Sequence, residues 1–114
     1  MANIYFNLKH KEVLDSILLE LPSVVPGKMF GYPAYYVDGK LFACVYEEGV
    51  GIKVPEKMAE DLVGQEGISY FQPMGRRKMK EWIQIGRARS DEYLKDRGIL
   101  ESSFRFVSSL SKRR

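Results

Sequence analysis

The sequence contains a single cysteine, Cys44, and a single histidine, His10, in 114 residues. No intrachain disulfide can form, and these two side chains are too few for a zinc site of the usual cysteine and histidine ligands. The glycine-rich strings that cradle phosphates, Gly-x-Gly-x-x-Gly and Gly-x-x-x-x-Gly-Lys-Ser/Thr, are also missing from the sequence. We therefore expect no metal, no cofactor and no nucleotide-dependent chemistry.

Long apolar runs are missing as well. The longest uncharged apolar run falls far short of the roughly 20 residues that cross a bilayer, and residues 1–6 lack the basic and apolar regions of a signal peptide. With 45% hydrophobic residues over 114 positions, the chain has enough apolar surface for one core and no surplus for a second. We expect one cytoplasmic domain spanning residues 1–114, with no membrane partner.

Charge is divided unevenly along the chain. Residues 1–74 carry 6 Lys/Arg and 10 Asp/Glu, a net charge of −4, whereas residues 75–114 carry 12 and 5, a net charge of +7. Such an asymmetry favours an acidic or anionic partner for the C-terminal third.

Apolar residues at helical spacing predict the first element. The positions i, i+3, i+4 and i+7 of one stretch are occupied by Leu14, Ile17, Leu18 and Leu21. Residues 8–21 are therefore predicted to form an amphipathic helix, with Asn7 as its N-cap and Pro22 as its end. Residues 22–28 have no period and contain proline and glycine, which favours a connecting loop.

A period of two follows in residues 29–54. Asp38-Gly39 tolerates the positive φ angles of a type I′ turn, so Val37 is expected to pair with Lys40, and a second turn is expected at Glu48-Gly49. Alternation outward from both turns assigns one apolar core face, and the opposite face is aromatic and basic. The predicted core face contains Ala34, Tyr36, Leu41, Ala43, Val45, Val50, Ile52 and Val54.

The remaining elements alternate between helix and strand. Residues 55–64 predict a short helix, and residues 68–72 and 82–85 predict two strands joined by a long basic loop. From Ser90 onward the pattern is helical, with Ser90 as N-cap and a break near Gly98. The predicted fold class is α+β: a five-stranded antiparallel sheet, made of a three-stranded meander and a hairpin, flanked by an N-terminal helix, a short middle helix and C-terminal helices.

Short motifs across the central part of the chain add a resemblance. They are Met29-Phe30-Gly31-Tyr32, Val37-Asp38-Gly39-Lys40-Leu41-Phe42-Ala43, Ile52-Lys53-Val54-Pro55, Phe71-Gln72-Pro73-Met74-Gly75-Arg76 and Met79-Lys80-Glu81-Trp82-Ile83. Together they resemble the N-terminal domain of the TfoX (Sxy) competence-regulator family. The resemblance implies an α+β fold with a five-stranded antiparallel sheet, and a non-enzymatic role near transcription regulation.

The densest group of cations is a candidate contact for anions or nucleic acid. It consists of Arg76, Arg77, Lys78 and Lys80, in the loop between the last two predicted strands. Closely spaced cations grip phosphates and make binding depend on salt. A solvated hairpin loop without a ligand is the alternative, and the basic end at residues 112–114 is a second candidate for phosphate contacts.

Three aromatic residues, Tyr35, Phe42 and Tyr46, share the mixed face of the predicted meander with Lys40 and Lys53. Their composition suits a dimer interface, stacking of single-stranded bases, or a second core layer beneath a helix. All three interpretations stay open. Residues 29–33 are expected to bend, as the entrance to the meander or as a groove.

Neither His10 nor Cys44 has a catalytic setting in the sequence. His10, near the start of the first helix, is expected to be exposed, and Cys44 is expected to be a small buried hydrophobe. We therefore expect no enzyme. The function predicted is a non-enzymatic interaction or regulatory domain that forms a homodimer or binds a protein partner. Nucleic-acid binding through residues 76–80 and the basic tail is the alternative.

Overall fold

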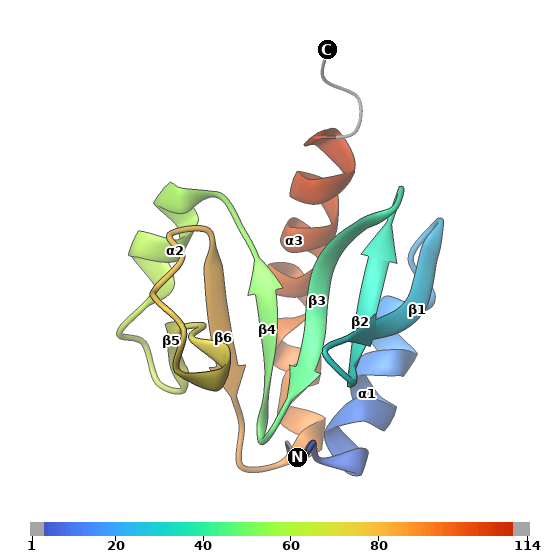
Figure 1. Cartoon of the computed structure of the whole chain (residues 1–114), viewed down its shortest axis with the longest axis horizontal. Helices are drawn as coiled ribbons and strands as arrows, with labels where there is room; N and C mark the ends of the chain where they lie inside the picture. The colour runs from blue at the N-terminus through green and yellow to red at the C-terminus, as the bar shows by residue number, and fades with distance from the viewer. Residues whose placement is uncertain (1–3, 111–114) are drawn as a thin grey trace.

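Within residues 4–110, which the computed structural model describes, the chain forms one six-stranded antiparallel sheet and three α-helices (Figure 1). The elements are α1 (Leu8–Leu18), β1 (Val24–Met29), β2 (Tyr32–Val37), β3 (Lys40–Tyr46), β4 (Gly49–Lys53), α2 (Glu56–Leu62), β5 (Ile68–Tyr70), β6 (Trp82–Gly86) and α3 (Arg97–Leu110). Two 3₁₀ helices, η1 (Pro73–Gly75) and η2 (Ser90–Asp96), lie in connections. The predicted α+β class with an antiparallel sheet is confirmed.

The helices cover only one face of the sheet. The strand order is β1-β2-β3-β4-β6-β5, and α1 and α3 lie behind the central strands in Figure 1. Apolar residues from all three α-helices and from η2 form one buried cluster with the side chains of that face. The opposite face, called the open face below, has no α-helix packed on it among the described residues, only the short 3₁₀ helix η1.

Helix α1 begins where the sequence predicts. The Asn7 side chain accepts hydrogen bonds from the backbone N–H groups of Lys9 (2.9 Å) and His10 (3.2 Å), which satisfies donors that a first turn leaves free. The helix ends at Leu18, before the predicted end at residue 21. The residue before Pro22 is disfavoured in a helical conformation, which accounts for the earlier end.

Residues 22–28 are not simply the loop that was predicted, because Val24–Met29 forms strand β1 along the edge of β2. Pro26 is tolerated there since an edge strand pairs on one side only. Gly27 is required by close packing: a Cβ at this position would lie 2.9 Å from the Tyr36 ring. The sheet therefore has six strands instead of the predicted five.

Two turns of the meander place both central residues at positive φ. Asp38-Gly39, with φ of 53° and 76°, joins β2 to β3, and Val37 pairs with Lys40, which confirms the predicted turn. Phe30-Gly31, with φ of 49° and 89°, joins β1 to β2. The bend expected at residues 29–33 is thus a second tight hairpin turn.

The turn between β3 and β4 lies one residue earlier than predicted. Tyr46 pairs with Gly49, so the turn residues are Glu47-Glu48 and not Glu48-Gly49. Glu47 has a φ of 52°, a conformation that the sequence rules assign to glycine, asparagine or aspartate. The segment before α1 supports it, since the Glu47 N–H donates to the Tyr5 carbonyl at 3.0 Å.

A β-bulge in β3 reverses the predicted faces of β2. Tyr36 pairs with Leu41, but Tyr35 pairs with Ala43, which leaves Phe42 as the extra residue. Phe42 and Ala43 therefore both face the helices, whereas Tyr36 and Leu41 face the open side. The predicted core face is right for Ala43, Val45, Val50, Ile52 and Val54 and wrong for Ala34, Tyr36 and Leu41.

The second predicted hairpin is present. Ile68–Tyr70 (β5) pairs with β6 within the predicted ranges, and β6 also pairs with β4, so the hairpin extends the meander at its far edge. In the C-terminal part, the N-cap is Arg89 and not Ser90: the Arg89 N–H donates to the Glu92 carboxylate at 2.9 Å. The predicted break near Gly98 corresponds to the change from η2 to α3 between Asp96 and Arg97, which is a change of helix type without an intervening loop.

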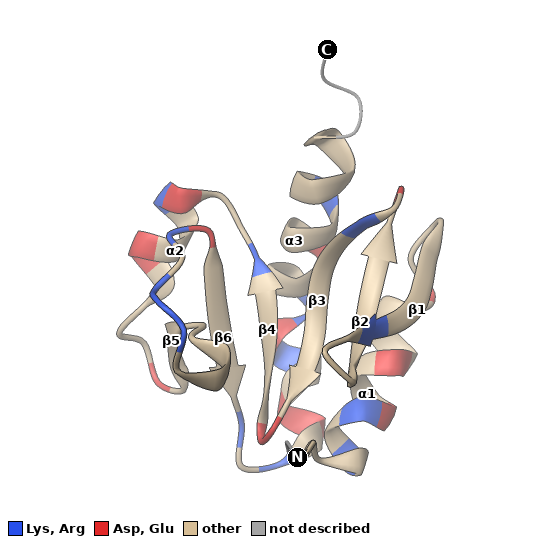
Figure 2. Cartoon of the chain, in the orientation of Figure 1, with Lys and Arg blue, Asp and Glu red and all other residues tan. Residues whose placement is uncertain are grey.

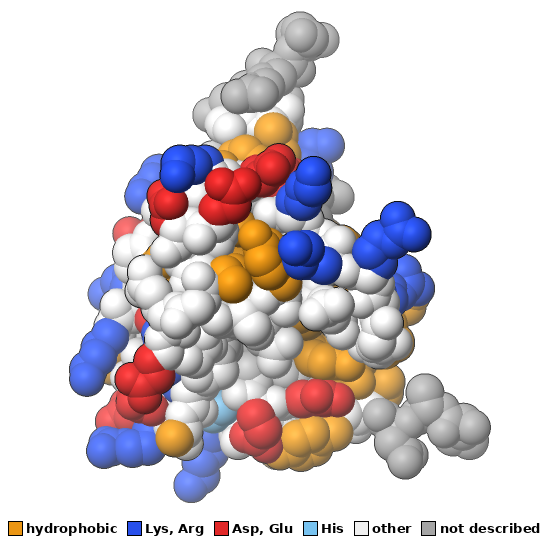
Figure 3. All heavy atoms as spheres, turned by 90° about the vertical axis from the view of Figure 1, so that its left-hand side faces the viewer, with side chains coloured by type: hydrophobic (Ala, Val, Ile, Leu, Met, Phe, Trp, Pro, Cys, Tyr) orange, Lys and Arg blue, Asp and Glu red, His pale blue; other side chains and the backbone are white. Residues whose placement is uncertain are grey.

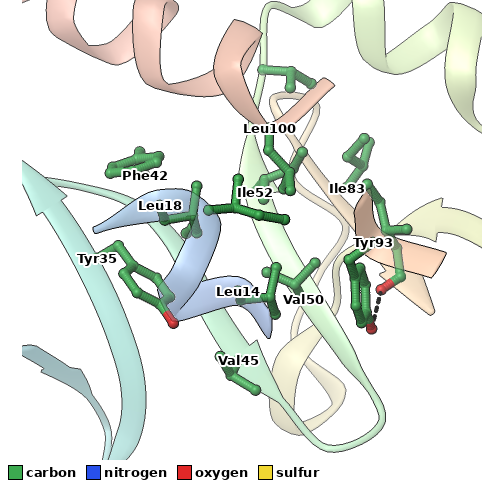
Figure 4. Packing of buried hydrophobic residues seen from close by; sticks show 14 of the residues in the cluster. Leu14, Leu18, Tyr35, Phe42, Val45, Val50, Ile52, Ile83, Tyr93 and Leu100 are labelled. Carbon is green, nitrogen blue, oxygen red and sulfur yellow. Dashed lines mark hydrogen bonds between the residues drawn. The ribbon is translucent and has the colours of Figure 1, made fainter. Parts of the chain in front are cut away.

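The core between the helices and the sheet is aliphatic at its centre (Figure 4). Helix α1 contributes Leu14 and Leu18, and α3 contributes Leu100, all fully buried. They pack against side chains of β3, β4 and β6, among them Val45, Val50, Ile52 and Ile83. Burial of this apolar surface is the main force that holds the helices on one face.

Two polar pairs are buried beside this core. His10 is 2% exposed, so the expected exposed histidine is wrong. Its Nδ1 lies 3.0 Å from the Tyr93 hydroxyl, because α1 packs against η2. The second pair joins β6 to η2: Arg87 donates to both carboxylate oxygens of Asp96, at 2.8 and 2.6 Å. Both pairs fix η2 beneath the sheet.

Candidate functional site

The open face carries a second apolar cluster of its own. Its buried members are Tyr32, Ala34, Cys44, Tyr46 and Phe71. Partly buried residues pack around them, namely Phe6, Met29, Tyr36, Leu41, Met79 and Trp82. None of these side chains lies under an α-helix of the described residues, so the cluster depends for its cover on the connection that contains η1.

The cover is the connection between β5 and β6, residues 71–81. The hydroxyl of Tyr46 accepts a hydrogen bond from the Met74 N–H at 2.8 Å, which ties this connection to β3. Phe71 lies flat against Gly51 of β4, where a Cβ would come within 2.5 Å of the ring. The absence of a side chain at Gly51 therefore makes the seat for Phe71.

Aromatic rings continue from this seat across the face. The ring centroids of Tyr32 and Tyr46 are 4.7 Å apart, those of Tyr46 and Phe71 are 5.4 Å apart, and those of Phe71 and Trp82 are 5.9 Å apart. Contacts of this kind add stability beyond the area they bury. These four packed rings form a rigid layer on the open face, called the floor below.

A groove of about 200 Å³ opens between this floor and the turn from β1 to β2. It is lined by Met29, Phe30, Leu41, Phe71, Pro73, Arg76, Met79 and Trp82. Seven of these eight residues are apolar or aromatic. Phe30 stands at the mouth with 60% of its surface exposed, which is unusual for so large an apolar side chain.

One cation, Arg76, lines this groove, and three more lie on the same loop. The Arg76 guanidinium carbon is 5.2 Å from the centre of the Phe30 ring, a cation–π contact that connects the loop to the β1–β2 turn. The Lys78 ammonium lies instead 4.6 Å from the centre of the Tyr70 ring. Arg77 and Lys80 are exposed on the same loop. Figure 2 shows the loop as a blue stretch beside β5 and β6.

The four cations predicted as one contact are thus on one loop, but Arg76 and Lys78 lie over different aromatic rings. Figure 3, which looks toward the β5 edge, shows basic side chains beside hydrophobic ones. On the adjacent strand, the Lys53 ammonium is 3.8 Å from the Glu81 carboxylate. The predicted basic tail at residues 112–114 lies outside the described residues.

The predicted aromatic contact of Tyr35, Phe42 and Tyr46 does not form. Tyr35 and Phe42 are buried against the helices, whereas Tyr46 is buried on the open face, because the bulge in β3 separates them. Tyr35 donates a hydrogen bond to Asp15 at 2.5 Å, and burial raises the pKa of its hydroxyl. Of the interpretations left open, a core layer beneath a helix is correct for Tyr35 and Phe42, whereas Tyr46 is buried in the open-face cluster.

A groove was one expectation for residues 29–33, and Met29 and Phe30 do line it, but Phe71 and Trp82 were missed as part of a site. Phe71 and Trp82 appear in the motifs that carry the family resemblance, and that was the one available signal. Alternation in β6 assigns Trp82 to the face opposite Ile83, but the sequence does not say that a loop leaves this face open.

Cys44 is buried as predicted, between the sheet and Phe71. Burial raises the pKa of its thiol to about 12. The side chain is therefore a neutral thiol near neutral pH and packs as a small hydrophobe.

Two larger hollows lie elsewhere. One of about 500 Å³ lies between the β2–β3 turn and the end of α3, beside Asp38, Phe104 and Arg105. Another of about 440 Å³ lies between the starts of α1 and η2, beside Lys9, His10 and Arg89. Both are open to solvent and lined in part by charged side chains. The groove on the open face is smaller, and its lining is more apolar than either, as ligand sites often are.

Residues 4–110 contain no cluster of three or more histidine, cysteine, aspartate or glutamate side chains that could hold a metal ion. Among the same residues, no helix has both the length and the apolar character to cross a membrane. Comparisons with known proteins gave no match to a protein-family model, a curated protein or a solved structure.

Proposed function

We propose that this chain is a non-enzymatic interaction domain that binds a protein partner or a second copy through the groove on its open face. The proposal takes the resemblance to the TfoX N-terminal domain as its prior expectation, including a link to transcription regulation. The observation that carries it is the groove itself: an apolar floor, an exposed Phe30 and Arg76 at the mouth, on a sheet face that no described α-helix covers.

Several features of this surface support a protein contact. Interface cores are enriched in tryptophan, phenylalanine, methionine and arginine. The groove lining contains all four types, in Trp82, Phe30, Met79 and Arg76. The rigid floor beneath them lowers the entropy that binding would otherwise cost.

Site-specific photocrosslinking inside living cells tests the proposal. A photoreactive phenylalanine analogue at position 30 is expected to give a discrete crosslinked adduct, whose mass separates a second copy from a different protein. The same analogue at position 25 of β1 is the control, because Val25 is also an exposed apolar residue. Adducts of equal yield from both positions, or none from position 30, would refute the proposal.

The second candidate function is nucleic-acid binding through the exposed cations Arg76, Arg77, Lys78 and Lys80. It predicts that DNA or RNA binds at low salt, that affinity falls steeply as salt rises, and that changing Arg76, Arg77 and Lys78 together to alanine weakens binding and reduces the salt dependence. Absence of binding at low salt, or equal binding by the triple variant, would exclude this role for the loop.

A further inference from the structure

We infer that the groove on the open face receives a bulky apolar side chain carried by an acidic segment of a partner protein. The inference rests on the proposed function and adds the chemistry of the partner. It follows from two properties of the same place: an apolar pocket, and a loop of positive charge that reaches it through Arg76.

The pocket fits one large apolar side chain. Its volume of about 200 Å³ is lined almost entirely by carbon and sulfur atoms of Met29, Leu41, Phe71, Met79 and Trp82. Methionine side chains adapt their shape to what they contact, and tryptophan is the residue most enriched among those that dominate binding energy. A polar or charged group placed on this apolar floor, away from Arg76 at the mouth, would lose its water at a cost.

The cations of the loop that borders the groove favour negative charge around that side chain. Residues 71–82 contain four cations, Arg76, Arg77, Lys78 and Lys80, and one carboxylate, Glu81, which leaves a net charge of +3. Arg76 is exposed at the mouth of the groove, where its planar guanidinium can donate two hydrogen bonds to one carboxylate. Complementary charge of this kind speeds association and excludes basic partners.

The arrangement fits an acidic peptide better than a nucleic acid. Stacked bases need open ring faces, but Arg76 already lies over Phe30, and Phe71 is buried against Gly51. A phosphate would need cations that converge, whereas Arg76 and Lys78 lie over different rings. Carboxylates spaced along an extended segment match cations that are spread along one loop, with Arg76 alone at the groove.

Trp82 provides the measurement, because it is the one tryptophan of the sequence and lines the groove. The probe is a synthetic acidic peptide with one central phenylalanine, titrated into the full chain while tryptophan emission is recorded. Two matched peptides replace the phenylalanine by alanine, or every acidic residue by its amide. We expect a saturable change with the first peptide and binding at least about tenfold weaker with each of the others.

Variants of the protein test the same two properties. Phe30→Ala and Arg76→Glu are each expected to weaken the binding of the acidic peptide by about tenfold. Leu8→Ala and Lys95→Glu are the matched controls, since both residues are exposed on the helical side of the molecule, and they should leave affinity unchanged. Raising salt from about 50 to about 300 mM should weaken binding of the wild-type chain.

Other outcomes overturn the inference in distinguishable ways. Equal binding of the acidic and the amide peptides would refute the acidic partner and leave the proposed function standing. The same would hold if no peptide changed the Trp82 signal while position 30 still crosslinked to a protein in cells. A short oligothymidylate that binds more tightly than the acidic peptide and is lost in Arg76→Glu would refute both and favour nucleic acid.

Discussion

At the scale of single residues, local backbone chemistry decides which turns the sequence reveals. Asp38-Gly39 was predictable because glycine and aspartate are common at positive φ. Glu47 was not, because its positive φ of 52° is stabilised by contacts with the N-terminal segment, which no local pattern encodes. Local sequence rules therefore placed this turn one residue too late, although they predicted the strands on either side of it.

Gly39→Val is expected to destabilise the fold by about 1–3 kcal/mol. The reason is conformational strain alone, since the φ of Gly39 is 76° and no atom lies within 4 Å of where a Cβ would be. Gly39→Asn is the matched control, because asparagine tolerates this region, and it should cost less than about 1 kcal/mol. Urea unfolding measures both, and equal stability of the valine variant and the wild type would contradict the turn geometry.

The buried His10 is expected to make the fold acid-sensitive. Burial lowers the pKa of His10 below 6.5 in the folded state, so below about pH 6.5 the unfolded chain binds a proton that the folded chain does not. The contribution of His10 to the free energy of unfolding should be constant above about pH 6.5 and should fall as the pH drops toward the lowered pKa of the folded state.

Urea unfolding of His10→Gln at about pH 8 and about pH 5.5 checks this expectation. The variant should lose less stability between the two pH values than the wild type does, because glutamine does not titrate. Identical losses would show that the His10 and Tyr93 pair does not carry this dependence.

At the scale of elements, periodicity identified each helix but could not show which segments meet. The sequence of β1 predicts a loop, because Pro26 and Gly27 interrupt any strand pattern. The segment is a strand only because it pairs with β2. The bulge at Phe42 is equally invisible to alternation, yet it decides that Tyr35 faces the helices. His10 and Tyr93 are 83 residues apart in sequence, so their contact depends on how α1 and η2 pack.

The ion pair that holds η2 against β6 gives a prediction at this scale. Asp96 is 4% exposed and binds Arg87 through both carboxylate oxygens. Asp96→Ala is expected to cost about 3–5 kcal/mol, because it leaves a partly buried guanidinium without its counter-charge. Thermal or urea unfolding measures the loss.

A double variant serves as the control for this pair. Arg87→Met combined with Asp96→Leu should recover most of the stability, since apolar side chains of similar volume can replace a buried ion pair. A double variant no more stable than Asp96→Ala would mean that the hydrogen bond from Arg87 to the Glu66 carbonyl, at 2.8 Å, matters more than the pair.

At the scale of the whole molecule, the two faces and the two edges of the sheet have different roles. Helices fill one face with the main core, which the sequence predicted in outline through the residues of β3 and β4. The candidate site on the other face arises because the connection from Phe71 to Glu81 crosses only part of it. That outcome depends on the long-range seat of Phe71 on Gly51 and was beyond local sequence rules.

The edges of the sheet bear on self-association. β5 has only three residues, and β1 is longer and largely exposed but contains Pro26 and Lys28. Proline has no N–H to offer a neighbouring strand, and a lysine on an edge opposes pairing with another copy. Pro26 and Lys28 therefore oppose strand pairing between copies at β1.

Replacing Pro26 and Lys28 together by valine is expected to release that protection. The variant restores an N–H and removes a charge on an edge that already exposes Val25, so strand pairing between copies should become favourable. Sedimentation velocity at matched concentrations is expected to show more dimer and larger species in the variant than in the wild type. A triple variant that also carries Phe30→Ala should associate as strongly as the double variant, because edge pairing does not use the groove. If Phe30→Ala abolishes the association, the contact between copies would instead lie on the open face.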